Sequence, residues 1–202
     1  MQNIVVKNLE NKNVNFGGFT SGFLLPKTEK NSDSFKHPPC EKLFPGDKPG
    51  CLLLQDGDNI LLYDFVKKRR LSSGKFDKIK RICWSPDRAF VALSSKYILY
   101  ICDSNLKVIT SFKSRKPVKS FIWHQESGCL LLSTDCQVMY LLPSGHQGSV
   151  RSTSEPLYLG LVHHDRLVCV NRKQQLRVLD INSSEFRFKS AVLAGNEQLY
   201  LR

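Results

Sequence analysis

The sequence has no apolar run of the length that a membrane span requires. Its longest apolar stretches, such as CLLL and YILYIC, are far shorter than the roughly 20 residues that cross a bilayer as a helix. The residues after Met1, QNIVVKNLENKN, also lack the charged, then apolar, then small-residue order of a secretory signal peptide. We therefore expect a protein of the cytoplasm.

Motifs for metal binding, disulfide formation and phosphate binding are missing as well. The seven cysteines occur singly, mostly within apolar runs, with no C-x-x-C pair and no Cys/His spacing of a zinc site. We expect them to be reduced core residues. SGHQGS (144–149) has the glycines of a phosphate loop but no lysine and no following helix, so we predict a hairpin loop there. The cysteines are Cys40, Cys51, Cys83, Cys102, Cys129, Cys136 and Cys169.

Two polar clusters raise the question of a metal or acid/base site. His163, His164 and Asp165 follow one another between two apolar runs, but adjacent side chains on a strand point to opposite faces, which favours a turn. Asp56 and Asp58 could begin a calcium loop, but the rest of the twelve-residue ligand pattern is missing. We therefore predict no catalytic, cofactor-binding or metal-binding residue, and no enzyme activity.

Acidic residues are few compared with basic ones. The chain has 18 Asp and Glu against 30 Lys and Arg, a formal charge of +12, which can indicate nucleic acid, an anionic membrane surface or an acidic protein as partner. The densest basic runs, VKKRR (66–70) and SFKSRKPVK (111–119), fall where turns are expected, so we first interpret them as solvated loops that protect strand edges. Contact with anionic lipid is the second interpretation. Nucleic acid is not expected, because no aromatic platform, glycine-loop clamp or basic helix accompanies the charge.

What the sequence does contain is a repeat of about 39 residues. Short apolar runs recur at intervals of 39, 39 and 38 residues, and three of the four end in aspartate, which predicts a repeated structural role for these aspartates. Trp84 and Trp123 are also 39 residues apart, so we predict that they are equivalent and both largely buried. The four runs end at Asp64, Asp103, Leu142 and Asp180.

Each repeat has the pattern of three or four short antiparallel strands. β-Branched and large apolar residues fill the runs, and Gly, Asp, Asn and Ser stand at the bends. Such a unit matches the blade of a WD40-type β-propeller, whose rings usually have four to eight blades. We predict an all-β fold, an incomplete WD40-type propeller of about 3.5 blades over residues 50–182, which is too few to close a ring.

The flanking segments break this pattern. Residues 1–15 contain NIVVKNLEN, which we assign to one strand of a preceding blade. Residues 16–49 are rich in Gly, Pro and polar residues and predict a loop insertion that is partly disordered. Residues 183–202 lose the alternation and predict the start of a helical region, with Ser184 as cap and a helix beginning near Glu185 or just beyond Gly195.

Several irregular stretches carry a family resemblance. VALSSKYILYICDSNL, VKSFIWHQESG, GHQGSVRS and RVLDINSSEFRFKSAVL, in this order, resemble the coatomer alpha-subunit family (alpha-COP). The resemblance extends from about Ile4 to Leu193. In that family the region is the latter part of the second of two N-terminal propellers, and EFRFKSAVL leads into a long α-helical solenoid.

The resemblance implies a structural subunit of the coatomer vesicle coat, acting in Golgi-to-ER and intra-Golgi protein transport. The implied partners are other coatomer subunits, with peripheral contact to Golgi membranes and coated vesicles, and with no cofactor or small-molecule substrate. The family's dilysine cargo site belongs to the first propeller, so no cargo-binding residue is assigned here. The alternatives are the beta-prime subunit of the same coat and a WD40-type scaffold that binds nucleic acid or anionic lipid through basic loops.

Overall fold

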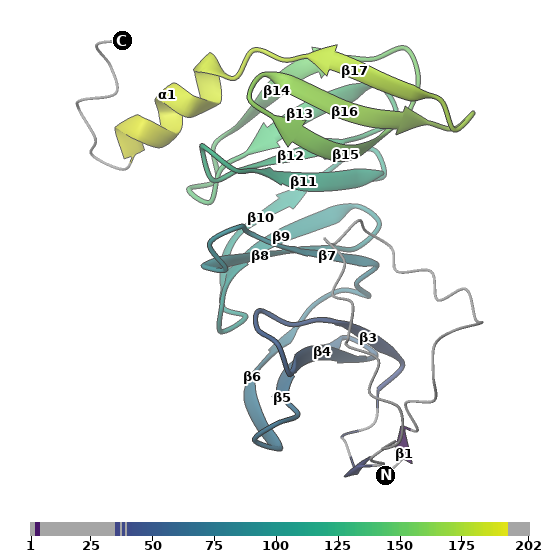
Figure 1. Cartoon of the computed structure of the whole chain (residues 1–202), viewed down its shortest axis with the longest axis vertical. Coiled ribbons are helices and arrows are strands. Elements are labelled where there is room, and N and C mark those ends of the chain that lie inside the picture. The colour runs from purple at the N-terminus through teal and green to yellow at the C-terminus, as the bar shows by residue number, and fades with distance from the viewer. Residues whose placement is uncertain (1–2, 5–34, 37, 39, 194–202) are drawn as a thin grey trace. The chain divides into compact units, whose positions relative to one another are not determined.

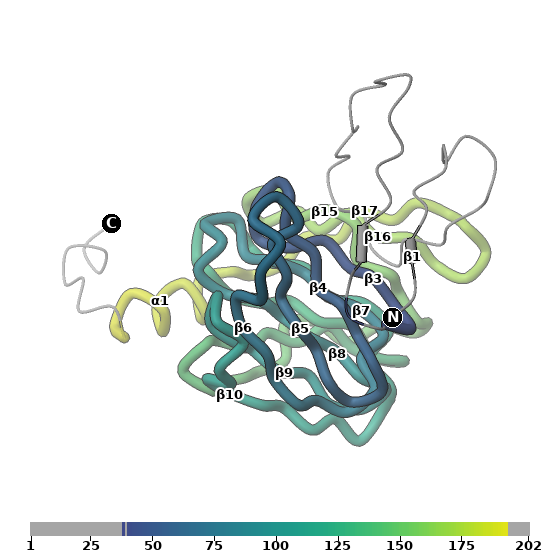
Figure 2. The backbone as a smooth tube through the Cα atoms, turned by 90° about the horizontal axis from the view of Figure 1, so that it is seen from below, coloured from purple at the N-terminus to yellow at the C-terminus, as the bar shows by residue number. Residues whose placement is uncertain are grey.

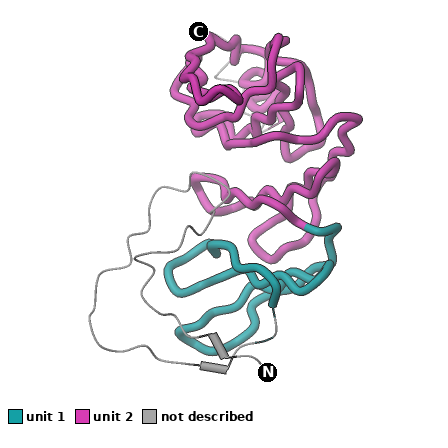
Figure 3. Tube along the Cα trace, turned by 90° about the vertical axis from the view of Figure 1, so that its right-hand side faces the viewer, with its two compact units in different colours: residues 1–78 teal, residues 79–202 magenta. Residues whose placement is uncertain are grey.

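The described residues form almost entirely antiparallel strands and the turns between them (Figure 1). The computed structural model describes residues 3–4, 35–36, 38 and 40–193. The chain forms two compact units, residues 1–78 and residues 79–202 (Figure 3), and each is described by itself. The predicted all-β class is confirmed.

The first unit contains one four-stranded sheet, which we call blade 1. β3 (Lys42–Pro45), β4 (Cys51–Asp56), β5 (Asn59–Asp64) and β6 (Arg69–Lys75) pair in chain order. A separate two-stranded pair joins β1 (Asn3–Ile4) to β2 (Phe35–Lys36). Blade 1 therefore begins eight residues before position 50, where the blades were predicted to start.

The strand β3 corrects part of the predicted loop insertion over residues 16–49. Its burial alternates between half-buried and exposed, as a strand requires, but Pro45, Gly46 and Pro49 gave the segment the composition of a loop. Pro45 is tolerated because it ends an outer strand of the sheet. Residues 5–34, 37 and 39 lie outside the described residues, so the strand assigned to 1–15 and the rest of the insertion stay predictions.

The second unit contains three further sheets, blades 2 to 4, whose strands also pair in chain order. Blades 2 and 3 have four strands each, and blade 4 has three strands followed by a helix. Figure 2 follows the same elements as a tube and shows α1 leaving the strand layers. The elements are β7 (Arg81–Trp84), β8 (Phe90–Ser94), β9 (Ile98–Asp103), β10 (Val108–Lys113), β11 (Ser120–His124), β12 (Cys129–Ser133), β13 (Gln137–Leu141), β14 (Gln147–Ser152), β15 (Leu157–His163), β16 (Arg166–Asn171), β17 (Leu176–Asp180) and α1 (Ser184–Leu193).

The two tryptophans occupy the same position in successive blades. Trp84 lies opposite Val91 between the first two strands of blade 2, and Trp123 lies opposite Leu130 between the first two strands of blade 3. Their side chains are 8% and 5% exposed. Both predictions about them, equivalence and burial, are confirmed, and so is the 39-residue period on which they rest.

The recurring aspartates share a role in two of the three cases. Asp64 Oδ1 accepts a hydrogen bond from the Lys67 backbone N–H at 2.8 Å, and Asp103 Oδ1 accepts from Asn105 and Lys107 at 2.9 and 2.8 Å. Both carboxylates thereby fix the turn from the third to the fourth strand. Asp180 is exposed and ends the third strand of blade 4, after which the chain turns into α1 instead of a fourth strand.

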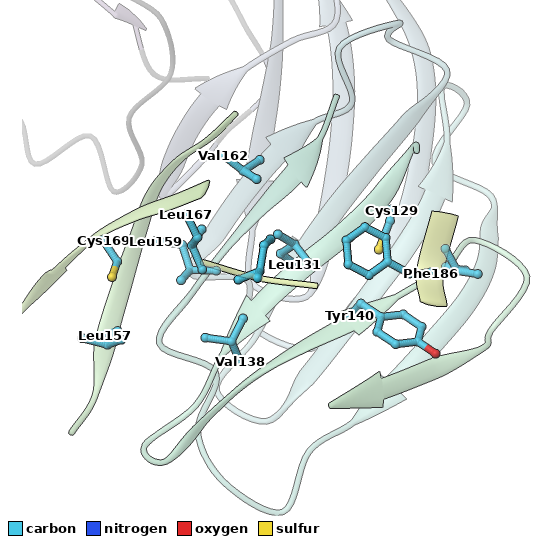
Figure 4. Packing of buried hydrophobic residues seen from close by; sticks show 12 residues of the cluster. Cys129, Leu131, Val138, Tyr140, Leu157, Leu159, Val162, Leu167, Cys169 and Phe186 are labelled. Atoms are coloured by element: carbon cyan, nitrogen blue, oxygen red, sulfur yellow. The ribbon is translucent and has the colours of Figure 1, made fainter. Parts of the chain in front are cut away.

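Neighbouring blades of the second unit pack face to face through apolar side chains. On β12, Leu130 and Leu132 pack with residues of blade 2, whereas Cys129 and Leu131 pack with residues of blade 4. Every residue of β12 is buried, so this strand is covered on both faces. Figure 4 shows the cluster between blades 3 and 4, which Phe186 of α1 joins beside Tyr140.

The helix begins where the sequence predicted a start, but its cap differs. Asn182 Oδ1 accepts the Ser184 backbone N–H at 2.9 Å, and the Ser183 carbonyl accepts the Arg187 N–H at 2.9 Å. Ser184 is thus the first helical residue rather than the cap. An Asn side chain satisfies a free N–H at a helix start as well as a serine does, which explains the shift. The alternative start beyond Gly195 lies outside the described residues.

We predict that Phe186→Ala destabilises the chain by about 3–5 kcal/mol, because it removes a fully buried ring from the cluster between blades 3 and 4. Urea unfolding of the full chain, followed by tryptophan fluorescence, measures the change. Phe188→Ala is the matched control: this ring is 58% exposed, and its loss should cost under about 1 kcal/mol. Equal losses for the two variants would show that Phe186 does not anchor the helix.

Candidate functional site

The structure buries four of the seven cysteines, leaves Cys40 and Cys83 half-buried, and exposes one. Cys51, Cys102, Cys129 and Cys169 are buried, and all seven are free thiols. Burial raises the pKa of Cys102 and of Cys129 to about 12, which leaves these thiols protonated and unreactive at neutral pH. Cys136 is exposed in the turn between β12 and β13, so the prediction of a core residue is wrong there.

The His-His-Asp sequence lies at a turn, as predicted, with His163 as the last residue of β15. His164 and Asp165 form the turn between β15 and β16, and His164 adopts the left-handed conformation with φ of 50°. Because of this turn geometry the rings of His163 and His164 lie side by side, with centroids 4.2 Å apart, instead of on opposite faces. His164 Nδ1 pairs with Glu126 Oε1 at 2.6 Å, so this imidazole is engaged by a neighbouring turn.

The aspartates near position 57 also occupy a turn. Asp56 ends β4, and the turn of Gly57 and Asp58 leads into β5, which confirms the hairpin. SGHQGS is likewise a hairpin between β13 and β14. Across the part of the chain that the structure describes, no group of three or more His, Cys, Asp or Glu residues could hold a metal ion.

Polar side chains tie each blade of the second unit to its neighbour. Trp123 Nε1 donates to the Cys83 carbonyl of blade 2 at 3.0 Å. Ser120 Oγ accepts the Leu159 backbone N–H of blade 4 at 2.7 Å. These donors and acceptors lie on the first strand of a blade and reach the first strand of the next, so they fix how far one blade slides along another.

His124 forms a third tie and is almost completely buried. Its Nε2 lies 3.2 Å from the carbonyl oxygen of His164, and since a carbonyl can only accept, Nε2 carries the proton. The other ring nitrogen, Nδ1, then accepts from the Ser127 hydroxyl at 2.9 Å. A histidine whose two nitrogens are both satisfied inside the core has a structural role.

A small charged cluster holds α1 on blade 3. Tyr140 donates its hydroxyl proton to Glu185 Oε1 at 2.8 Å, and Lys189 Nζ donates to the Tyr140 hydroxyl and to Glu185 Oε1, both at 2.7 Å. The hydrogen bond from Lys189, followed by that from Tyr140, lowers the pKa of the Glu185 carboxyl below its ordinary value of 4.5. The hydrogen bond that Lys189 donates to Glu185, followed by the one it donates to Tyr140, raises the pKa of Lys189. Sequence reasoning missed this cluster, and the Glu185–Lys189 spacing of four residues on a predicted helix was its one visible signal.

One face of blade 4 is apolar and exposed. Leu161, Val168 and Val178 lie opposite one another across its three strands, and Leu161 and Val178 are 54% and 56% exposed. Val170 and Leu176 extend this face. The equivalent middle strand of blade 3 is buried on both sides, so blade 4 presents the kind of face that a further blade covers.

The meandering sheets, the 39-residue period and the face-to-face packing define the class of this protein as a WD40-type β-propeller, here an incomplete one. Comparison with known families identifies it further. The family described as COPA/B second beta-propeller matches residues 24–171, and the chain belongs to that family.

Curated relatives agree with this assignment. The chain is 30% identical to coatomer subunit alpha of Saccharomyces cerevisiae over 154 residues, which is 76% of this chain and 13% of the relative. It is 31% identical to the putative coatomer subunit alpha of Schizosaccharomyces pombe over 192 residues, which is 95% of this chain and 14% of the relative. The chain therefore spans about an eighth of the length of the curated relatives that it matches.

Solved structures agree on the fold alone. The computationally designed Ika4 protein superposes with a TM-score of 0.53 at 10% identity, covering 67% of this chain and 88% of that one. Dihydro-heme d1 dehydrogenase NirN, solved in complex with DHE, superposes with a TM-score of 0.56 at 10% identity, covering 70% and 34%. Within its described residues, the structure contains no helix long and apolar enough to cross a membrane.

We predict that acid loosens the attachment of α1. A carboxyl whose pKa is lowered in the folded state stabilises that state above its ordinary pKa, and the contribution of Glu185 is lost as the pH falls through 4.5 and below. Thermal unfolding midpoints measured between pH 6 and pH 3 should therefore fall less for Glu185→Gln than for the unchanged chain. The two curves should converge at the acid end. Parallel curves would show that the carboxylate of Glu185 does not stabilise the fold.

Proposed function

We propose that this chain is part of a structural subunit of the coatomer vesicle coat and acts in Golgi-to-ER and intra-Golgi protein transport. The observation that carries the proposal is the family match over residues 24–171, together with relatives that are alpha subunits of coatomer. The alternative of a beta-prime subunit has less support, because the relatives compared above are alpha subunits.

The packing supports a role in assembly. A blade of this class is stable when apolar neighbours cover both of its faces, and blade 4 has one such face uncovered among the described residues. We propose that another blade of a longer propeller covers Leu161, Val178 and their neighbours. The partners are then other coatomer subunits, and the place of action is the cytoplasm and the surface of Golgi membranes and coated vesicles.

The proposal assigns no catalysis, and the described side chains give a positive reason for this. The buried histidine His124 has both ring nitrogens satisfied, and burial keeps the pKa of the core thiols high. The other polar residues considered as candidate sites lie at turns and stabilise them, or form hydrogen bonds between blades. We therefore propose a scaffold and not an enzyme.

We expect the tagged endogenous protein, captured from cytosol, to arrive with other coatomer subunits when its partners are read by mass spectrometry. The same experiment reads the mass of the tagged polypeptide. Capture of the tagged protein without any coatomer subunit would contradict the coat assignment. A matched capture of an unrelated tagged WD40-type protein sets the background.

We predict that the 202-residue chain expressed alone self-associates through the uncovered face of blade 4. The double variant L176K/V178K places two charges on that face, where the side chains are 66% and 56% exposed, and should remain monomeric at higher concentration. The control V108K/I109K adds the same charges to β10, where both side chains are 45% exposed. Light scattering measures the effect, and equal improvement by both variants would count against this face.

A further inference from the structure

The two ends of the blades in the second unit are chemically different. Because the strands alternate in direction, the hairpins from second to third strand lie at the same end as the connections between blades. Hydrogen bonds confirm this: the Ser114 N–H donates to the Tyr97 carbonyl at 2.7 Å, and the Thr153 N–H donates to the Cys136 carbonyl at 2.8 Å. We call this the connector end. It comprises residue 80 and residues 95–97, 114–119, 134–136, 153–156 and 172–175.

The connector end is much more positively charged than the opposite end. Its segments hold seven basic and two acidic residues, whereas the turns at the opposite end, residues 85–89, 104–107, 125–128, 142–146 and 164–165, hold two basic and three acidic ones. Among the turns and connections of this unit, the positive charge is therefore concentrated at the connector end. The basic residues of the connector end are Lys80, Lys96, Arg115, Lys116, Lys119, Arg172 and Lys173, and the acidic ones are Asp135 and Glu155.

Both acidic residues of this end already have partners. Lys119 Nζ lies 2.8 Å from Asp135 Oδ1, and Asn171 Nδ2 donates to Glu155 Oε1 at 3.0 Å. The hydrogen bond from Lys119 is the main cause that lowers the pKa of Asp135, and the charges of Arg172 and Lys116 act in the same direction. One carboxylate is thus held among three cations.

The other six basic side chains of the connector end are exposed. None of them forms an ion pair with another described residue. Lys96 lies over the ring of Tyr97 at 5.1 Å, and Lys116 Nζ lies 3.2 Å from Cys136 Sγ, so both have neutral neighbours. These cations remain available to an anionic partner.

We propose that the connector end binds an acidic segment of a partner protein, with Lys116, Arg172 and Lys173 as the central contacts. The carboxylate of Asp135 pairs with Lys119 and lies near Lys116 and Arg172. It shows that carboxylates bind to the basic groups of this surface. A surface that docks on lipid usually adds exposed apolar side chains to its basic ones, and Tyr97 is the one large exposed apolar side chain of this end. This binding surface is independent of the proposed coat role, because it is inferred from the distribution of charged residues and not from the family match.

The test uses the full chain held on a sensor surface at low density, which prevents self-association. The probe is a fluorescein-labelled peptide of alternating Glu and Ser with ten glutamates, and vesicles containing phosphatidylserine serve as the second probe. K116Q/R172Q/K173Q should bind the peptide about tenfold more weakly, and added salt should weaken binding by the unchanged chain. The control R88Q/K107Q/R166Q removes three charges from the opposite half of the blades and should change binding less than about twofold.

Each outcome decides the proposal. Weaker peptide binding by K116Q/R172Q/K173Q but not by the control variant supports the proposal. Equal loss of peptide binding in both variants would mean that the peptide is attracted by the net charge alone, and would overturn the proposal. Binding of vesicles without binding of the peptide would mean that the surface contacts a membrane, and would overturn it as well. Failure of the unchanged chain to bind the peptide overturns it too. None of these results bears on the capture of coatomer subunits, so the two proposals fail separately.

Discussion

Mutual covering of neighbouring blades is the constraint on which the second unit depends. A middle strand such as β12 has large apolar residues on both faces, and Leu130, Leu131 and Leu132 are all buried because blades 2 and 4 lie on either side. Burying a leucine contributes roughly 1.5–3 kcal/mol, so one such strand accounts for much of the stability of a blade. A blade with one uncovered face lacks this burial on that side. The exposed apolar face of blade 4 is therefore where a further blade is most needed for stability.

Hydrogen bonds between blades fix the position of one blade along its neighbour. The hydrogen bonds from Trp123 of blade 3 to Cys83 of blade 2 and from Leu159 of blade 4 to Ser120 of blade 3 each join the first strands of neighbouring blades. Apolar faces alone would tolerate sliding, whereas a hydrogen bond to a buried backbone group is lost when the register changes. In blade 4 the third strand is followed in the chain by α1 instead of a fourth strand, and Phe186 and the Glu185 cluster fasten this helix to blade 3.

The period of the sequence predicted most of the fold, because blades repeat local hairpin chemistry. The positions of Trp84 and Trp123, the turn at His164 and the start of α1 all followed from spacing and turn residues. β3 was missed because Pro45 and its neighbours mark loops elsewhere, and Cys136 was misplaced because it resembles the core cysteines in sequence. The cluster around Glu185 and the basic connector end depend on contacts between blades, which spacing along one chain does not reveal.

We propose that a further blade covers the apolar face of blade 4 in the working protein. The most direct measurement is maleimide labelling of Val178→Cys, with the exposed Cys136 changed to Ser, in the isolated chain at a dilution that keeps it monomeric and in the complex captured from cells. We predict rapid labelling in the isolated chain and protection in the complex. Equally rapid labelling in both would show that the apolar face stays open, and would contradict the claim.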